Sequence, residues 1–286
     1  MPRRSVPEKW PTGLIEVAPN VYGYIQDGEP GTSNGGLLVG EEGAIAIDAL
    51  FTPRHTRGFL RAIRKATPKP VRQLINTHHH TDHTGGNHLF AGAQIIAHAN
   101  CREEMSRSVL DLERLRRLSP RIADEMKGVP KVLPFTTYTG QMTLYLGRRI
   151  IQLLHRGPAH TAGDTLVYLP EERVLFAGDV AFHYVAPVAF DGHVSDWIRV
   201  ADRIAALDVE VIVPGHGPIG TKAELREMRD CLALVRRQAR RLFLAGEPEK
   251  EAALKLNVGG YYAQWIFPER LPLLVRRLYM EFRGEI

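Results

Sequence analysis

Four side chains that can bind a metal ion lie within six consecutive positions of this sequence. They form the pattern His-x-His-x-Asp-His, made by His78, His80, Asp82 and His83. The largely apolar run 71–75 precedes the pattern, and a Gly-Gly-Asn segment that we expect to begin a helix follows it. A strand would therefore deliver these side chains to a tight loop. Because histidine nitrogens and carboxylate oxygens bind divalent cations, the pattern predicts a metal site at the end of a strand.

Three further candidate ligands occur where other predicted strands end. His160 lies in a loop flanked by glycines, Asp179 closes the buried-looking run 174–178, and His216 follows the strand 211–213 in a Pro-Gly-His-Gly sequence. A single loop histidine is more often a solvated side chain than a ligand. Together with the histidine motif, these ligands make four sites at strand ends. Four such sites in one chain favour a shared metal centre, since a rigid sheet can hold groups that a flexible loop could not.

The order of these motifs along the chain resembles that of the metallo-β-lactamase superfamily of dinuclear metallohydrolases. The resemblance covers about residues 32–220 and begins with the segments 33–39 and 44–49, which look like the opening strand pair of the family. It implies an α/β fold, the four-layer αββα sandwich, with the metal ions at one edge of the two sheets. We expect the strands within 14–31 to belong to this catalytic core, and a helical C-terminal extension over 221–286 to pack on it.

The resemblance also implies how the metal ions are held. The first would be bound by His78, His80 and His160, the second by Asp82, His83 and His216, and the carboxylate of Asp179 would bridge them. With only nitrogen and oxygen ligands, two zinc ions are expected, although iron or manganese could bind the same set. Asp164 and Thr161 are candidates to support the ligating imidazoles.

This ligand set predicts a particular chemistry. Two divalent cations that share a carboxylate lie about 3.5–4 Å apart and can hold a hydroxide between them. A metal ion lowers the pKa of its bound water to about 7, which gives a nucleophile without a serine or cysteine. Asp82 would also orient that hydroxide and accept a proton. His183 and Tyr184, which closely follow the bridging carboxylate, could donate hydrogen bonds to an oxyanion and complete the catalytic candidates.

The function expected from this set is metal-dependent hydrolysis of a small ester, thioester or lactone. The alternative is a polyketide cyclase or thioesterase that uses the same metals on a larger aromatic substrate, which a wide apolar cleft would favour. Other branches of the superfamily fit less well. β-Lactamases generally lack the bridging carboxylate that Asp179 supplies, and nucleases normally bring an RNA-gripping element. Diiron redox members usually carry Glu in place of His80 and append a flavin domain.

The composition suits an enzyme with one large domain or a domain with an extension, because 286 residues with 44% hydrophobic side chains can bury a sizeable core. No apolar run approaches the roughly 20 residues of a membrane span. The basic start of the chain lacks the apolar stretch of a signal peptide. Cys101 and Cys231 are too few for a disulfide framework. These features predict a cytoplasmic protein.

The net charge of +5 comes mainly from scattered arginines. The arginine-rich run 236–241 is more typical of the solvent-exposed face of a helix than of a nucleic-acid-binding surface. No ladder of aromatic and basic residues supports nucleic-acid binding. We therefore expect a small-molecule substrate, which could be anionic, and neither a nucleic-acid nor a membrane partner. The chain could form a homodimer.

Local patterns predict the elements around the motifs. A helix is expected over 56–65 and should end before Thr67-Pro68, because the residue before proline disfavours helical geometry. The charged stretch 100–127 is predicted to be helical and to cap the metal cleft. Further elements are predicted as hairpins at 142–154 and 166–177, a helix at 196–207, a capping box at 221–224, and later helices at 250–256 and 271–282.

Other histidines and aromatic residues are assigned supporting roles. His79 alternates away from the ligands and is expected to flank them, while His98 and His155 are expected to have structural roles at strand ends. Four aromatic residues could line a substrate pocket, although core packing is the favoured role for each: Phe135, Tyr138, Phe190 and Trp265.

Overall fold

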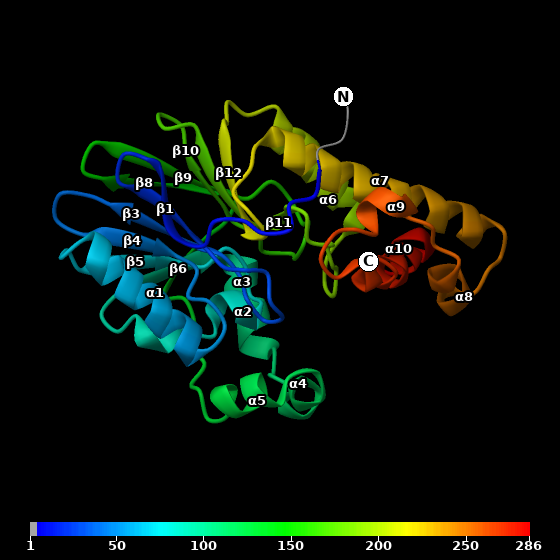
Figure 1. Cartoon of the computed structure of the whole chain (residues 1–286), viewed down its shortest axis with the longest axis horizontal. Helices are drawn as coiled ribbons and strands as arrows, with labels where there is room; N and C mark the ends of the chain where they lie inside the picture. The colour runs from blue at the N-terminus through cyan, green and yellow to red at the C-terminus, as the bar shows by residue number, and fades with distance from the viewer. Residues whose placement is uncertain (1–4) are drawn as a thin grey trace.

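Short apolar runs separated by turns pair into two β-sheets in the computed structural model, which describes residues 5–286 (Figure 1). The first sheet has seven strands in chain order: β1 (Gly13–Ala18), β2 (Val21–Ile25), β3 (Gly35–Val39), β4 (Ala44–Ile47), β5 (Val71–Ile75), β6 (Gln94–His98) and β7 (Thr136–Tyr138). Strands β1 to β4 pair antiparallel, and β4 to β7 pair parallel. The strands predicted within 14–31 therefore belong to this sheet. The basic start considered above includes residues 1–4, which lie outside the described residues.

The second sheet has five strands in the order β12-β11-β10-β9-β8. They are β8 (Gln141–Leu146), β9 (Arg149–Leu154), β10 (Leu166–Leu169), β11 (Val174–Phe182) and β12 (Val211–His216). Both predicted hairpins are confirmed: Leu146 pairs with Arg149 across a two-residue turn, and Leu169 pairs with Val174. Gly147 has φ +65°, a left-handed conformation that glycine adopts without steric cost. In this second sheet β11 and β12 pair parallel, whereas the other neighbouring strands pair antiparallel.

The inner faces of the two sheets meet in one apolar core. Ile45, Ile75, Val167, Phe176 and Val213 are all buried in it. Burial of each such side chain contributes about 1.5–3 kcal/mol. All nine residues of β11 are buried, because helices cover its other face. The sheets are thereby fixed against each other at the edge where the candidate ligands lie.

Helices cover both outer faces and complete the predicted αββα sandwich (Figure 1). On the seven-stranded sheet, Phe59 and Ile63 of α1 (Pro53–Ala66) pack with Leu74. On the five-stranded sheet, Trp197 of α6 (Val194–Ala205) and Met228 of α7 (Lys222–Leu244) share one cluster with β11. Helix α1 begins earlier than predicted because Thr52 caps its first turn and a proline occupies the first position, and it ends before Thr67 as expected.

The C-terminal segment is helical and packs on this outer layer. Its elements are α7, α8 (Glu249–Leu254), α9 (Gly259–Tyr262), the 3-10 turn η2 (Pro268–Arg270) and α10 (Leu273–Arg283). The predicted capping box at the start of α7 is confirmed, with Thr221 and Glu224 bonded reciprocally. Helix α10 begins two residues later than predicted, so that Pro272 precedes it. Tyr262, Leu274 and Leu278 lie in the same cluster as Trp197. The division into separate units at residue 220 stays a prediction.

The charged stretch predicted as helical forms three separate helices: α3 (Ala99–Arg107), α4 (Leu112–Leu118) and α5 (Pro120–Met126). The last break follows from Ser119, which precedes a proline and is extended, with φ −155° and ψ 96°. Helix α5 packs Ile122 and Met126 against Phe51, and the α4–α5 pair projects from the sandwich (Figure 1). Within residues 5–286, none of the helices is both long and apolar enough to cross a membrane.

His98 and His155 lie at strand ends in structural roles, as expected. His98 Nδ1 accepts the backbone N–H of Asn100 at 3.2 Å and so caps α3, and its ring stacks on His155 at 4.1 Å. Burial, and then the neighbouring His155, lower the pKa of His98 to about 4. Protonation of Nδ1 would remove the capping acceptor. The neutral ring is therefore the form that stabilises the fold.

Because the pKa of His98 is lower in the folded than in the unfolded chain, its contribution to stability is present above pH 6.5 and is lost as the pH falls toward 4. We expect His98→Asn, which keeps a capping oxygen, to reduce this acid sensitivity by about 1–2 kcal/mol between those pH values. Urea unfolding of both proteins at pH 7 and pH 4.5, with chelator present, measures the difference. Equal losses in both proteins would contradict the assignment.

Candidate metal centre

The seven predicted ligands come from four places in the fold that meet at one edge of the two sheets. Their ligand atoms form two groups, and within each group all atoms lie within 4.8 Å of one another. The first group is His78, His80, His160 and Asp179, and the second is Asp82, His83 and His216. The short helix α2 (Thr81–Thr84) begins inside the histidine motif rather than after it, and a single 3-10 turn, η1 (Asn87–Leu89), follows.

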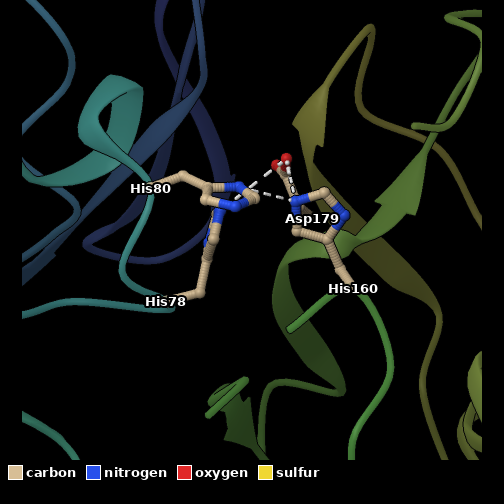
Figure 2. Close-up of side chains that lie close together, drawn as sticks. All are labelled: His78, His80, His160 and Asp179. Atoms are coloured by element: carbon tan, nitrogen blue, oxygen red, sulfur yellow. Dashed lines mark hydrogen bonds and ion pairs between the residues drawn. The ribbon is translucent and has the colours of Figure 1, made fainter. Parts of the chain in front are cut away.

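In the first group, three imidazoles and one carboxylate lie close together (Figure 2). Nδ1 of His80 lies 2.9 Å from Nε2 of His160, and that nitrogen lies 3.1 Å from Oδ2 of Asp179. Nε2 of His78 lies 3.8 Å from the same oxygen. Three nitrogens and one oxygen around one point make a donor set that suits a divalent cation such as zinc.

Asp179 also reaches the second group. Its Oδ1 lies 3.1 Å from Nε2 of His83, and its Oδ2 lies 3.4 Å from Nε2 of His216. Asp82 completes this group, with Oδ2 at 3.6 Å from His83 and 3.3 Å from His216. One carboxylate therefore lies between two sets of donors. This arrangement suits a pair of cations that share a ligand.

Several of the buried atoms that could bind a metal ion make no hydrogen bond within residues 5–286. They include Nε2 of His78, Nε2 of His83 and Oδ1 of Asp179, all of which point into the two groups. Buried polar atoms are nearly always paired in folded proteins, because an unpaired one keeps its desolvation cost. Cations in the two groups would satisfy these atoms. The residues therefore fit a dinuclear metal centre.

The electrostatics of the two groups agree with this fit. Burial raises the pKa of Asp179, but His216, His83 and the other imidazoles outweigh burial and hold it well below its usual range. Burial lowers the pKa of His216, but Asp179 and Asp82 outweigh that effect and raise it to about 9. The carboxylates thus favour positive charge among the imidazoles, and protons supply that charge when no cation does.

Asp179 is placed by an irregularity inside β11, rather than by the strand end that the sequence predicted. Between Gly178 and Phe182 the pairing of β11 with β12 shifts, so that extra residues of β11 face a shorter stretch of β12. Such a bulge bends a strand and re-aims its side chains. Gly215 on β12 leaves room for the result, since a Cβ there would lie 1.9 Å from Oδ1 of Asp179. The glycine of the Pro-Gly-His-Gly motif is therefore needed for close approach.

Asp48 accepts three hydrogen bonds that hold the histidine loop in place, a role that the sequence analysis did not predict. Its Oδ1 accepts the Thr77 amide at 2.8 Å, and its Oδ2 accepts the Thr77 hydroxyl at 2.7 Å and Nδ1–H of His83 at 2.8 Å. The same hydroxyl lies 3.1 Å from Nδ1 of His78. These bonds leave Nε2 of both imidazoles free for a cation. The only signal in the sequence was an acidic residue directly after the strand at 44–47.

The expected supporting pair, Asp164 and Thr161, instead bond to each other. Asp164 accepts the backbone amide and the hydroxyl of Thr161, the latter at 2.6 Å, and so shapes the loop that carries His160. Aromatic rings also support the imidazoles. Phe182 stacks on His216 at 5.0 Å between ring centroids, and Trp197 lies 5.2 Å from His160.

The structure does not bring His183 and Tyr184 together with the seven ligands. His183 is fully buried, and its Nδ1 donates to the Pro218 carbonyl at 3.0 Å, beside Glu224. The Tyr184 hydroxyl lies 3.5 Å from Glu224, and its ring faces Trp265 at 6.5 Å. After the bulge in β11, both side chains contact residues at the start of α7 and in the C-terminal segment, and the catalytic role expected of them stays a prediction.

Of the four aromatic residues for which core packing was the favoured role, two lie in the core and two do not. Tyr138 and Trp265 are buried, whereas Phe135 is exposed. Phe190 is half-exposed, and its ring lies 6.3 Å from His80 and 5.7 Å from the guanidinium of Arg114 on α4. Helix α4, which belongs to the stretch expected to cap the metal cleft, therefore lies near His80 through the ring of Phe190.

We expect Asp48→Asn to weaken metal binding about 10–100-fold, because an amide cannot accept from the Thr77 amide, the Thr77 hydroxyl and His83 together. Competition between the metal-free protein and a chromophoric chelator for Zn²⁺ measures the loss. Asp124→Asn, on the exposed surface of α5, is the matched control and should bind as the unaltered protein does. Equal affinities for the two variants would show that Asp48 does not support the ligands.

Known proteins share both the sequence pattern and the fold. The chain is 32% identical over 188 residues to the 2,4-dinitroanisole O-demethylase subunit alpha of a Nocardioides species, which covers 63% of this chain and 51% of that protein. It is 24% identical over 235 residues to the metallo-beta-lactamase type 2 of Bacillus cereus, covering 77% of this chain and 84% of the lactamase. The chain thus spans about half the length of the first of these relatives.

Among solved structures, the inverting sec-alkylsulfatase Pisa1 from a Pseudomonas species superposes with a TM-score of 0.74 at 18% identity. The match covers 96% of this chain and 51% of the sulfatase, so the similarity of fold includes the C-terminal helices. The family model described as metallo-beta-lactamase superfamily matches residues 28–216, which is the part that carries all seven candidate ligands. The expected superfamily and fold are both confirmed. The chain belongs to the metallo-β-lactamase superfamily.

Proposed function

We propose that this chain is a dinuclear metal-dependent hydrolase that acts on a small ester, thioester or lactone. One observation carries the proposal: seven nitrogen- and oxygen-bearing side chains form two groups that share the carboxylate of Asp179. Two divalent cations there would supply Lewis acidity and would lower the pKa of water to about 7. We propose zinc for both, with iron or manganese as alternatives.

The residues around the groups define what the chain itself would contribute. Asp82 is about one-quarter exposed, unlike the buried Asp179, and so its carboxylate can reach water and substrate. Burial raises the pKa of Asp82, but His83 and His216 outweigh burial and hold it well below its usual range. Asp82 is therefore ionised at neutral pH. It would accept a hydrogen bond from the attacking water and orient it toward the substrate.

The borders of the mouth favour a small substrate with a negative charge. Arg114 lies beside the half-exposed Phe190, which suits a polar or charged substrate better than a wide aromatic one. The ester, thioester and lactone substrates therefore lead over the polyketide cyclase alternative. The named activities of the relatives add an aryl methyl ether and an alkyl sulfate to the substrates that need testing.

Arg270 in η2 supports an anionic substrate. Burial lowers the pKa of Arg270, while the carboxylates of Glu269, Asp82 and Asp179 act in the opposite direction. Its guanidinium lies over the ring of Phe267 at 3.9 Å, which keeps it in place. The Ile266 amide donates to the Tyr184 carbonyl at 3.0 Å and thereby fixes this segment beside the continuation of β11.

Rates of the metal-loaded protein on a substrate panel test the proposed function. The panel contains a lactone, an acyl thioester, a β-lactam, an activated phosphodiester, an alkyl sulfate and a nitroaryl methyl ether. We expect turnover of the lactone or thioester that chelator abolishes and added Zn²⁺ restores. His83→Ala should lower that rate about 100-fold or more, since it removes a ligand and not only a supporting group.

His88→Ala is the matched control, because His88 is the next histidine along the chain and its Nδ1 bonds only to the Gly85 carbonyl among the described residues. It should keep the rate of the unaltered protein. A protein that binds fewer than one metal ion per chain, or a rate that chelator and His83→Ala both leave unchanged, would overturn the proposed function.

Replacement of Arg270 separates charged from neutral substrates. We expect Arg270→Gln to raise KM about 10-fold for a substrate with a carboxylate or sulfate, with little change in kcat, because a charge-assisted hydrogen bond is lost in binding. A neutral substrate with the same scissile bond should keep its KM. The same rise in KM for both substrates would show that Arg270 shapes the mouth without selecting charge.

A further inference from the structure

The loop at 190–193, between β11 and α6, contacts a candidate metal ligand through a carboxylate. Oδ2 of Asp191 accepts Nε2–H of His80 at 2.9 Å and lies 3.4 Å from Nε2 of His79. His80 turns its other nitrogen, Nδ1, toward His160 and the first group. An acceptor at Nε2 favours the tautomer that carries its proton there, which leaves the lone pair of Nδ1 available for a cation.

The same loop also packs against a second ligand of that group. A Cβ on Gly192 would lie 2.6 Å from the Ala159 carbonyl oxygen and 2.7 Å from that of His160, so the two backbones are in direct contact. The His193 amide donates to the Ala159 carbonyl at 2.9 Å. One short loop therefore touches the side chain of His80 and the backbone of His160. We refer to residues 190–193 as the bracket loop.

Helix α10 also binds the bracket loop, through hydrogen bonds from one arginine. Nε of Arg277 donates to the Gly192 carbonyl at 2.8 Å, and Nη2 donates to the Asp191 carbonyl at 3.0 Å. Two parallel bonds from one planar guanidinium fix both position and orientation. A lysine ammonium at this position could not reproduce the pair. The contact links residues 85 and 86 positions apart in the chain.

The charge of Asp191 agrees with this role. Its hydrogen bonds with His79 and His80 outweigh burial and hold its pKa below the usual range, so it is a carboxylate at neutral pH. An ionised acceptor raises the basicity of the imidazole that it contacts. Asp191 lies outside the His-x-His-x-Asp-His motif, 111 positions beyond His80.

We propose that Asp191 and Arg277 are positioning residues for the first metal site, and that Arg277 makes the affinity of that site depend on the C-terminal helix. Asp191 orients the ring of His80, and Arg277 holds the loop that carries Asp191. The inference rests on the proposed metal centre and concerns only the group His78, His80, His160 and Asp179. The second group has none of these contacts among the hydrogen bonds of residues 5–286.

Stepwise Zn²⁺ dissociation constants, measured by chelator competition without substrate, test this proposal. We expect Asp191→Ala to weaken one of the two steps about 10–100-fold and to leave the other within about threefold. Asp191→Asn keeps a neutral acceptor and should give a smaller loss. Arg277→Ala should weaken the same step about 3–10-fold, with Arg277→Lys between it and the unaltered protein.

Arg276→Ala is the matched control, because Arg276 is the exposed neighbour of Arg277 on the same helix. It should leave both constants unchanged. A His83→Ala background, in which the second group lacks a ligand, assigns the affected step: the remaining site should still weaken on Asp191→Ala. Thermal unfolding of the metal-free variants measures any general loss of stability.

The outcomes separate this inference from the proposed function. If the unaltered protein binds fewer than one Zn²⁺ per chain, the proposed metal centre itself fails. If the unaltered protein binds two and the Asp191 and Arg277 variants match it, the metal centre stands and the inference is wrong. Equal weakening of both steps, together with a lower unfolding temperature of the metal-free protein, would show a general structural role and would also overturn the inference.

Discussion

The buried carboxylate of Asp179 is the constraint on which the arrangement of the site depends. Only 3% of this side chain is exposed, and an ionised carboxylate at such depth is tolerated only when donors or opposite charges surround it. Imidazoles of both groups lie within 3.8 Å of its oxygens. The segments that carry these imidazoles must therefore come together around Asp179. The bulge in β11 and the bare backbone of Gly215 make that point accessible to the carboxylate.

The two sheets together fix this meeting point, and neither could do so alone. The seven-stranded sheet delivers the histidine motif after β5, and the five-stranded sheet delivers Asp179 and His216. Asn34, which directly precedes β3, joins the sheets at the site. Its backbone N–H donates to the Gly215 carbonyl at 2.7 Å, and its side-chain amide donates to the Pro214 and Gly217 carbonyls. The bonds of Asn34 therefore help to hold the segments that carry the candidate ligands in place.

The C-terminal helices lie beyond the residues that the family model matches, yet they contact the site in two ways. Phe182 and Trp197 belong to the cluster that the helices share with β11, and their rings lie against His216 and His160. Arg277 bonds to the bracket loop, and Asp191 in that loop bonds to His80. The outer helical layer thus acts as structural support for the imidazoles as well as a cover for the sheet.

The seven candidate ligands, the superfamily, the two hairpins and the capping box of α7 could be predicted from the residues alone, because each depends on short motifs and on their order along the chain. Which groups support the ligands depends on the tertiary structure. Asp48, Asp191 and Arg277 are 35, 111 and 85 positions away from the residues that they contact, and no local pattern marks such pairs. The tertiary structure also decided that His183 and Tyr184 contact Pro218 and Glu224, because the pairing of β11 with β12 is irregular directly before these two residues. Ligand identity follows from short-range chemistry, whereas ligand support follows from which distant segments the apolar core brings together.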